Sequence, residues 1–251
     1  MSASAAFEEY ARDASLLAGG GAAILLQLLD PVVARGVAAH SAFARDPVGR
    51  LRGTLEYVYA IALGEEGLRT LAAARVDAMH RGVPGAREAE HQLWVAATLH
   101  AVGTAAYARY RRPLAEEVLD EVYARAAAIG TALQLPPEVW PADRAAFDVY
   151  WAGVLAEAEV GEDARRVAHD LLRPAAGPRW LRAAMPLVRI ATADLLPPAV
   201  RDAYGLPARP RLTATTVALA RVALRIAPRR LRELPARRLL AGLEERSTRR
   251  R

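Results

Sequence analysis

The histidines are the side chains of this sequence best suited to hold a metal ion. There are five of them, and the chain contains no cysteine that could supply a thiolate ligand. No two histidines are spaced as an H-x-x-x-H pair, which excludes a zincin-type zinc site. A metal would therefore be bound by imidazole together with carboxylate or tyrosine oxygen, and the candidate nitrogen ligands are His40, His80, His91, His100 and His169.

One pair of residues has the spacing of a known metal motif. Glu88 and His91 form a Glu-x-x-His unit, which places a carboxylate and an imidazole on one face of a helix. Di-iron carboxylate bundles use two such units, and the sequence contains one. A di-iron centre is therefore an alternative for which half of the ligands are missing.

Several other classes of site are excluded by composition. Without cysteine there is no disulfide, no iron–sulfur cluster and no covalently attached haem. Every basic residue is arginine, so a Schiff-base lysine and a P-loop lysine are absent. The chain has no G-x-S-x-G motif, and Gly19 to Gly21 lack the spacing of a dinucleotide fingerprint, which favours a close helix approach or a helix break there.

His80 and two polar residues before it are expected on consecutive helices. Asp46 and Pro47 are typical of a helix start, and Gly64 of its end, so Arg50 and Thr54 should lie one turn apart on this helix. The next helix begins at Glu65 and ends between Gly82 and Gly85, with His80 in its last turn. From these residues alone, the favoured interpretation of His80 is a surface histidine or a hydrogen-bonded core histidine. Arg50 would be a surface side chain and Thr54 a residue bonded to its own backbone.

The rest of the chain has the same helical character. Ala, Leu, Arg and Glu recur at intervals of three and four residues, and further helices are expected at 86–109, 114–133 and 143–159. The sequence predicts an all-α, compact single domain of about eight to ten helices over residues 1–225, given typical helix lengths. Residues 226–251 form a basic, arginine-rich C-terminal tail.

The net charge of +6 is concentrated at the C-terminus. From residue 225 onward 10 Arg stand against 3 Glu, a net of +7, which leaves a body of −1. A basic tail suits an anionic membrane surface, whereas the absence of Tyr, Phe and Trp after residue 225 disfavours nucleic-acid binding. Residues 1–12 do not read as an export signal, and the longest uncharged stretch, 14–29, is too short to span a bilayer. The expected location is cytoplasmic, with peripheral membrane association open.

Two segments carry a family resemblance. Residues 46–54, Asp-Pro-Val-Gly-Arg-Leu-Arg-Gly-Thr, and residues 75–85, Arg-Val-Asp-Ala-Met-His-Arg-Gly-Val-Pro-Gly, resemble the rubber-oxygenase (latex-clearing) and MpaB-type oxygenase family. Residues 25–43, 94–99 and 195–206 are similar to further blocks of that family. The resemblance covers the chain from about residue 15 to residue 235.

The resemblance implies an all-helical fold that encloses a non-covalent haem b. It gives His80 as the axial ligand of the haem iron, with Arg50 and Thr54 close to the haem; Arg50 would donate to a propionate or to dioxygen. His40 is the second candidate for the ligand. The chain departs from many relatives, which have histidine where it has Asp30 and Ala96.

The implied function is a haem-dependent oxidoreductase or oxygenase that cleaves carbon–carbon double bonds with dioxygen. Its substrate would be a hydrophobic, isoprenoid-like small molecule, and an apolar Ala/Leu interior suits both such a substrate and a porphyrin. The alternative is a non-catalytic helical protein that binds an apolar ligand or a membrane surface.

Overall fold

The computed structural model describes residues 2–40 and 46–248. Of His40 it describes only the backbone. These residues form fourteen α-helices, two short 3₁₀ helices and no strand, so the predicted all-α class is confirmed. In chain order the elements are α1 (Ala3–Arg12), η1 (Ala14–Gly19), α2 (Gly20–Gln27), α3 (Pro31–His40), α4 (Pro47–Leu63), α5 (Glu66–His80), α6 (Ala89–Tyr110), α7 (Glu116–Thr131), η2 (Pro137–Val139), α8 (Arg144–Glu157), α9 (Glu162–Leu172), α10 (Arg179–Leu195), α11 (Pro198–Ala203), α12 (Pro210–Ile226), α13 (Arg229–Arg232) and α14 (Leu234–Thr248).

The helix count is higher than the eight to ten expected from the sequence. The long predicted helices are present as α4 to α8, close to their expected bounds. The additional helices are short ones that begin at or directly after proline, such as α11 after Pro197 and α13 after Pro228. Short helices of this kind have little periodicity, so the apolar spacing of the sequence does not mark them.

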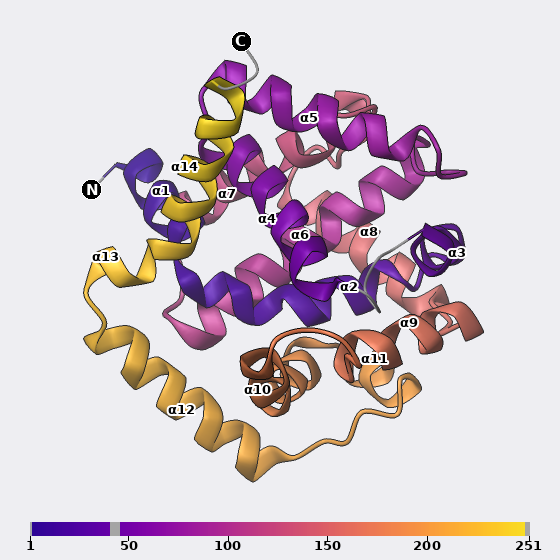
Figure 1. Ribbon diagram of the computed structural model, residues 1–251, viewed down its shortest axis with the longest axis vertical. Helices are drawn as coiled ribbons and strands as arrows, with labels where there is room; N and C mark the ends of the chain where they lie inside the picture. Colours follow the sequence, from indigo (N-terminus) through magenta and orange to yellow (C-terminus); the bar gives the residue numbers. More distant parts are fainter. Residues whose placement is uncertain (1, 41–45, 249–251) are drawn as a thin grey trace.

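Helix α6 lies in the middle of the molecule and supplies much of the core (Figure 1). Trp94 of α6 is buried, donates from Nε1 to the carbonyl of Leu26 at 2.9 Å and stacks on Trp151 with ring centroids 5.2 Å apart. Gly21 of α2 approaches α10 closely, because a Cβ atom there would lie 2.1 Å from Thr192 Oγ1. The expected close approach at the triple glycine is therefore confirmed.

Helices α4 and α5, which carry the predicted site residues, form an adjacent pair. Asp46 caps α4 by accepting from the Gly49 amide at 2.8 Å, Pro47 is the first helical residue, and Gly64 ends the helix. The caps read from the sequence thus set the position of Arg50 along α4. Helix α5 ends at His80 itself, earlier than the glycines that were expected to end it.

The basic C-terminal segment is folded onto the body as far as residue 248. Helix α14 lies across α4 (Figure 1) and contacts α5, and its apolar side chains are buried beside Tyr59 and Ile61. Those apolar residues are Ala236, Leu240 and Leu243. A boundary at residue 225 stays a prediction, but the described part of 226–251 is a packed element and not a free tail.

None of the described helices has both the length and the apolar character to cross a membrane alone. One sharply bent pair, 14–27 with 31–39 at an angle of 109°, meets the length and composition criteria only when the two parts are taken together.

Candidate functional site

His80 is the last residue of α5 and is half-buried. Its Nδ1 atom is buried and has no hydrogen-bond partner among the described residues. A buried polar atom without a partner is costly, and it is found where a ligand, a water or a chemical role accounts for it. This histidine is thus set apart from one that is satisfied by its own fold.

Arg50 and Thr54 lie one turn apart in the first half of α4. The Arg50 guanidinium donates from Nη1 to Thr54 Oγ1 at 3.5 Å, and the Thr54 hydroxyl donates to the Arg50 carbonyl at 3.3 Å. The second bond is the backbone contact that threonine commonly makes within a helix. Thr54 therefore links the Arg50 side chain to the helix that carries it.

The surroundings of His80 favour the neutral form of its imidazole. Burial is the main cause that lowers the pKa of His80, and the positive charges of Arg50 and Arg87 lower it further, against the opposing effect of Asp77. Because Arg50 acts on this pKa, its cation lies within electrostatic range of the imidazole. A neutral imidazole has the lone pair that a metal ligand needs.

A polar network fixes the end of α5 one turn before His80. Asp77 Oδ1 accepts from Gln134 Nε2 at 2.8 Å and forms an ion pair with Arg87 Nε at 3.0 Å. The backbone N–H of Gln134 donates to Gln92 Oε1 at 2.9 Å, and Gln92 Nε2 donates to Gln134 Oε1 at 2.8 Å. These residues were not predicted from the sequence. Asp77 could have been found by its spacing of three residues from His80, whereas no local pattern relates Gln92 to Gln134.

The loop after His80 packs against α3. Gly85 has φ +77°, and a Cβ atom there would lie 2.3 Å from Val32 Cγ1, so glycine is required for both backbone and space. Asp30 caps α3 by accepting from the Val32 amide at 2.8 Å, and its Oδ2 contacts Nδ1 of His91 at 2.5 Å. Asp30 thus joins α3 to the start of α6.

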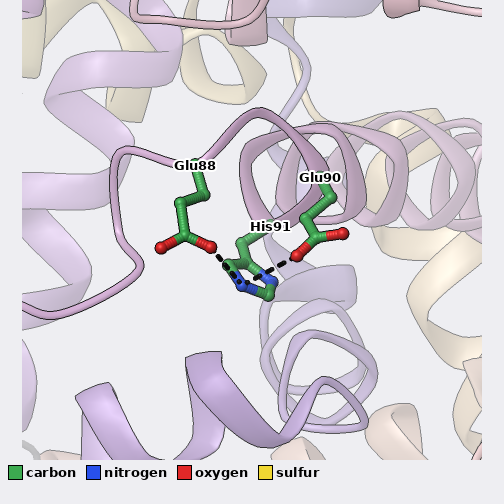
Figure 2. A group of neighbouring side chains, drawn as sticks. All are labelled: Glu88, Glu90 and His91. Atoms are coloured by element: carbon green, nitrogen blue, oxygen red, sulfur yellow. Dashed lines mark ion pairs between the residues drawn. The ribbon is translucent and has the colours of Figure 1, made fainter.

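His91 is buried among three carboxylates. Figure 2 shows the His91 ring between Glu88 and Glu90. Its Nε2 atom lies 3.4 Å from Glu88 Oε2 and 3.5 Å from Glu90 Oε1, and its Nδ1 atom faces Asp30 Oδ2. Both glutamates are exposed and lie at the start of α6, where acidic residues stabilise a helix. No second Glu-x-x-His unit accompanies this group in the chain, so a di-iron centre has half of its ligands.

The remaining histidines have other surroundings. His100 lies among the rings of Tyr123, Trp140 and Phe147, and burial is the main cause that lowers its pKa to about 4. His169 is exposed on α9 beside Asp170. The side chain of His40, the second candidate ligand, lies outside the described residues.

His80 does not line either of two cavities at the surface of the protein. Two open cavities of about 410 and 420 Å³ are lined by other residues, the first by Arg109, Asp194 and Arg221 among others. The structure brings His80 and Arg50 within electrostatic range, and Thr54 is bonded to Arg50. An enclosed haem pocket stays a prediction.

Known proteins resemble this chain over most of its length. It is 33% identical over 229 residues to a protein of Mycobacterium tuberculosis described as uncharacterized, across 82% of this chain and 88% of that relative. A Mycobacterium bovis protein with the same description matches to the same extent. No solved structure matches at a significant level. Residues 8–228 match the family described as "ER-bound oxygenase mpaB/B'/Rubber oxygenase, catalytic domain", and the chain therefore belongs to this family of oxygenases.

Proposed function

We propose that this protein is a haem b-dependent oxygenase that acts on a hydrophobic, isoprenoid-like substrate with dioxygen. Membership of an oxygenase family supports the reaction class. The observation that carries the haem assignment is His80, a neutral half-buried imidazole with an unpartnered buried Nδ1 and the Arg50 cation within electrostatic range. Imidazole is an axial ligand of haem iron in many proteins, and this chain has no cysteine that could replace it.

The residues around His80 suit a haem chemically. A haem would supply the activation of dioxygen, which no side chain of this protein can perform alone. Arg50 would pair with a carboxylate such as a haem propionate, because its guanidinium carries five donors and a permanent charge. Thr54 holds the Arg50 side chain through the bond to Nη1 and so restricts where that cation lies. The Asp77 network keeps the end of α5, and with it His80, in place.

Haem binding is tested by adding haemin to the purified protein. We expect a Soret band that is abolished or strongly shifted in His80→Ala. His169→Ala is the matched control, because His169 is an exposed histidine on another helix and its loss should leave the band unchanged. Retention of the wild-type band and iron coordination in His80→Ala would contradict the assignment of His80. If His40→Ala removes the band instead, the ligand is His40.

The reaction is tested separately with short isoprenoid hydrocarbons. Cleavage of one carbon–carbon double bond by one dioxygen molecule gives two carbonyl groups, each with one oxygen atom. We expect isotope-labelled dioxygen to label both carbonyl products. Binding of the hydrocarbon without any product, in protein that carries haem, would favour the non-catalytic apolar-ligand alternative.

A further inference from the structure

Helix α12 lies at the edge of the molecule and packs with one side only. In Figure 1 it runs along the lower border, with α10 as a neighbour, and it contacts α10 and α6. Its inner side is formed by Val217, Ala220 and Leu224, which pack around Tyr110 and Ala191. This side accounts for the attachment of α12 to the body.

The outer side of α12 is also apolar, although it faces solvent. Leu212 is 44% exposed, Leu219 66%, Val222 58% and Ile226 76%. At about 100° per residue these four side chains fall within an arc of about 80° on one side of the helix. We call them the outer face. Leu231 on α13, 60% exposed, follows shortly along the chain.

The charge around the outer face has a single sign. Residues 208–232 contain seven arginines and no aspartate or glutamate. Arg232 is paired with Asp13, Arg229 with Glu233, and Arg221 donates to the carbonyls of Ala108 and Arg109.

Besides Arg221, four arginines of this segment form no ion pair with any described residue, and they are Arg209, Arg211, Arg225 and Arg230. The helical spacing places Arg211 and Arg225 along one border of the outer face. An apolar stripe bordered by arginine is the pattern of a helix that lies in a membrane interface.

We propose that the outer face of α12, together with α13, docks on an anionic lipid surface. The apolar side chains would enter the interface while the arginines meet lipid phosphates. Association of two copies through this face is disfavoured, because it would bring cations together with no acidic residue to pair with them. The inference goes beyond the proposed function and needs no haem.

The proposal also moves the membrane contact away from the C-terminal tail. Arg246 of α14 donates to Glu56 at 2.7 Å, and the apolar side of α14 is buried against α4. Deletion of residues 226–251 would therefore disturb the fold as well as the charge. Single side chains of α12 are exposed, so they can be replaced without opening the core.

The test is sedimentation of the full chain with vesicles at low salt. We expect binding to vesicles of phosphatidylcholine mixed with phosphatidylglycerol, weak binding to pure phosphatidylcholine, and loss of binding in high salt. The double variant Leu219→Gln/Ile226→Gln should lower the partition coefficient on the order of tenfold or more, from the lost apolar burial. Val149→Gln is the matched control, since Val149 on α8 is 75% exposed at another surface.

Charge is tested with Arg225→Gln/Arg230→Gln. We expect a loss of roughly thirtyfold, because each basic residue near an anionic surface contributes a factor of about five. Arg237→Gln/Arg238→Gln on α14 is the control and should retain binding. Equal binding by the Leu219→Gln/Ile226→Gln protein, or an equal loss in either control, overturns the proposal. The proposal is also overturned if the wild-type protein does not bind vesicles but forms a dimer that Leu219→Gln/Ile226→Gln converts to a monomer.

Discussion

Buried polar groups are treated differently in two regions of the molecule. The first region, which we call the C-terminal clamp, consists of Asp13 and Glu56 with the arginines paired to them. There the buried carboxylate of Asp13 faces Arg111 and Arg232, at 3.6 and 3.5 Å. The buried carboxylate of Glu56 is shared by three arginines, which are Arg52, Arg75 and Arg246. In the region of His80 and His100, burial lowers the pKa of both imidazoles, and neither Nδ1 has a hydrogen-bond partner among the described residues.

The difference separates residues that hold the fold from residues that remain available. Charges of opposite sign at the clamp join distant parts of the chain: Asp13, near the N-terminus, pairs with Arg232, and Glu56 of α4 pairs with Arg246 of α14. Neutral imidazoles carry no charge with which to form such an ion pair. An unpartnered nitrogen is costly for stability but useful for binding, and the following predictions test that division.

The largest effect is expected from Asp13→Asn. The asparagine keeps a side-chain oxygen that can accept from the Ser15 amide, as Asp13 does at 2.9 Å, but removes the charge that faces the buried Arg232 and the partly buried Arg111. We expect the free energy of unfolding to fall by about 3–5 kcal/mol, the range for breaking a buried ion pair. Denaturant unfolding measures it.

Glu8→Gln is the control for this prediction, because Glu8 forms an exposed ion pair with Arg12 at 3.8 Å. It should change stability by less than about 1 kcal/mol. Equal stabilities of Asp13→Asn and Glu8→Gln would remove the distinction between a buried clamp and ordinary surface charge.

The second effect is the pH dependence that comes from His100. Its pKa is lowered from 6.5 to about 4 in the fold, so the unfolded chain binds the proton more tightly. Stability from this group is fully present above pH 6.5 and is lost as the pH falls towards 4. We expect His100→Leu to reduce the acid-induced loss by about 2–3 kcal/mol between pH 7 and pH 4.

His169→Leu gives the comparison for this pH effect, since His169 is exposed and its replacement should leave the slope of stability against pH as it is in wild type. The measurement is denaturant unfolding at several pH values. A wild-type slope in His100→Leu would mean that His100 is not held neutral by burial.

The smallest effect concerns the interaction between Arg50 and His80. Because Arg50 lowers the pKa of His80 and Asp77 raises it, Arg50→Gln should raise that pKa and Asp77→Asn should lower it. Titration of the histidine ring signals by NMR in haem-free protein measures both shifts. Arg81→Gln is the control, as Arg81 is adjacent in sequence but is not among the charges that act on His80. Shifts of the same sign in both variants would contradict the geometry.

Local signals in the sequence predicted the helices that carry the candidate site, because their ends depend on nearby residues. Asp46 and Pro47 start α4 as the sequence indicates, and Gly64 ends it. Contacts between distant residues were not predictable in this way. The bond from Gln134 to Gln92 spans 42 residues, and neither glutamine has a local pattern that identifies its partner.

The C-terminal segment shows why charge counts mislead. Its arginines suggested a separate tail, whereas Ala236, Leu240 and Leu243 have the spacing of a buried helix face and are buried. That spacing is present in the sequence, between arginines that determine the net charge of the segment. The family model ends at residue 228, so the packed helix α14 lies outside the part shared with that model.

The packing of α14 has a consequence for synthesis of the protein. A chain is made from its N-terminus, so α14 leaves the ribosome after the other described helices. Until it does, Tyr59 and Ile61 of α4 lack the cover that Ala236, Leu240 and Leu243 provide, and Glu56 lacks Arg246. The pair of helices that carries Arg50 and His80 is therefore completed only after residues 234–248 have been made, long after α4 and α5 themselves.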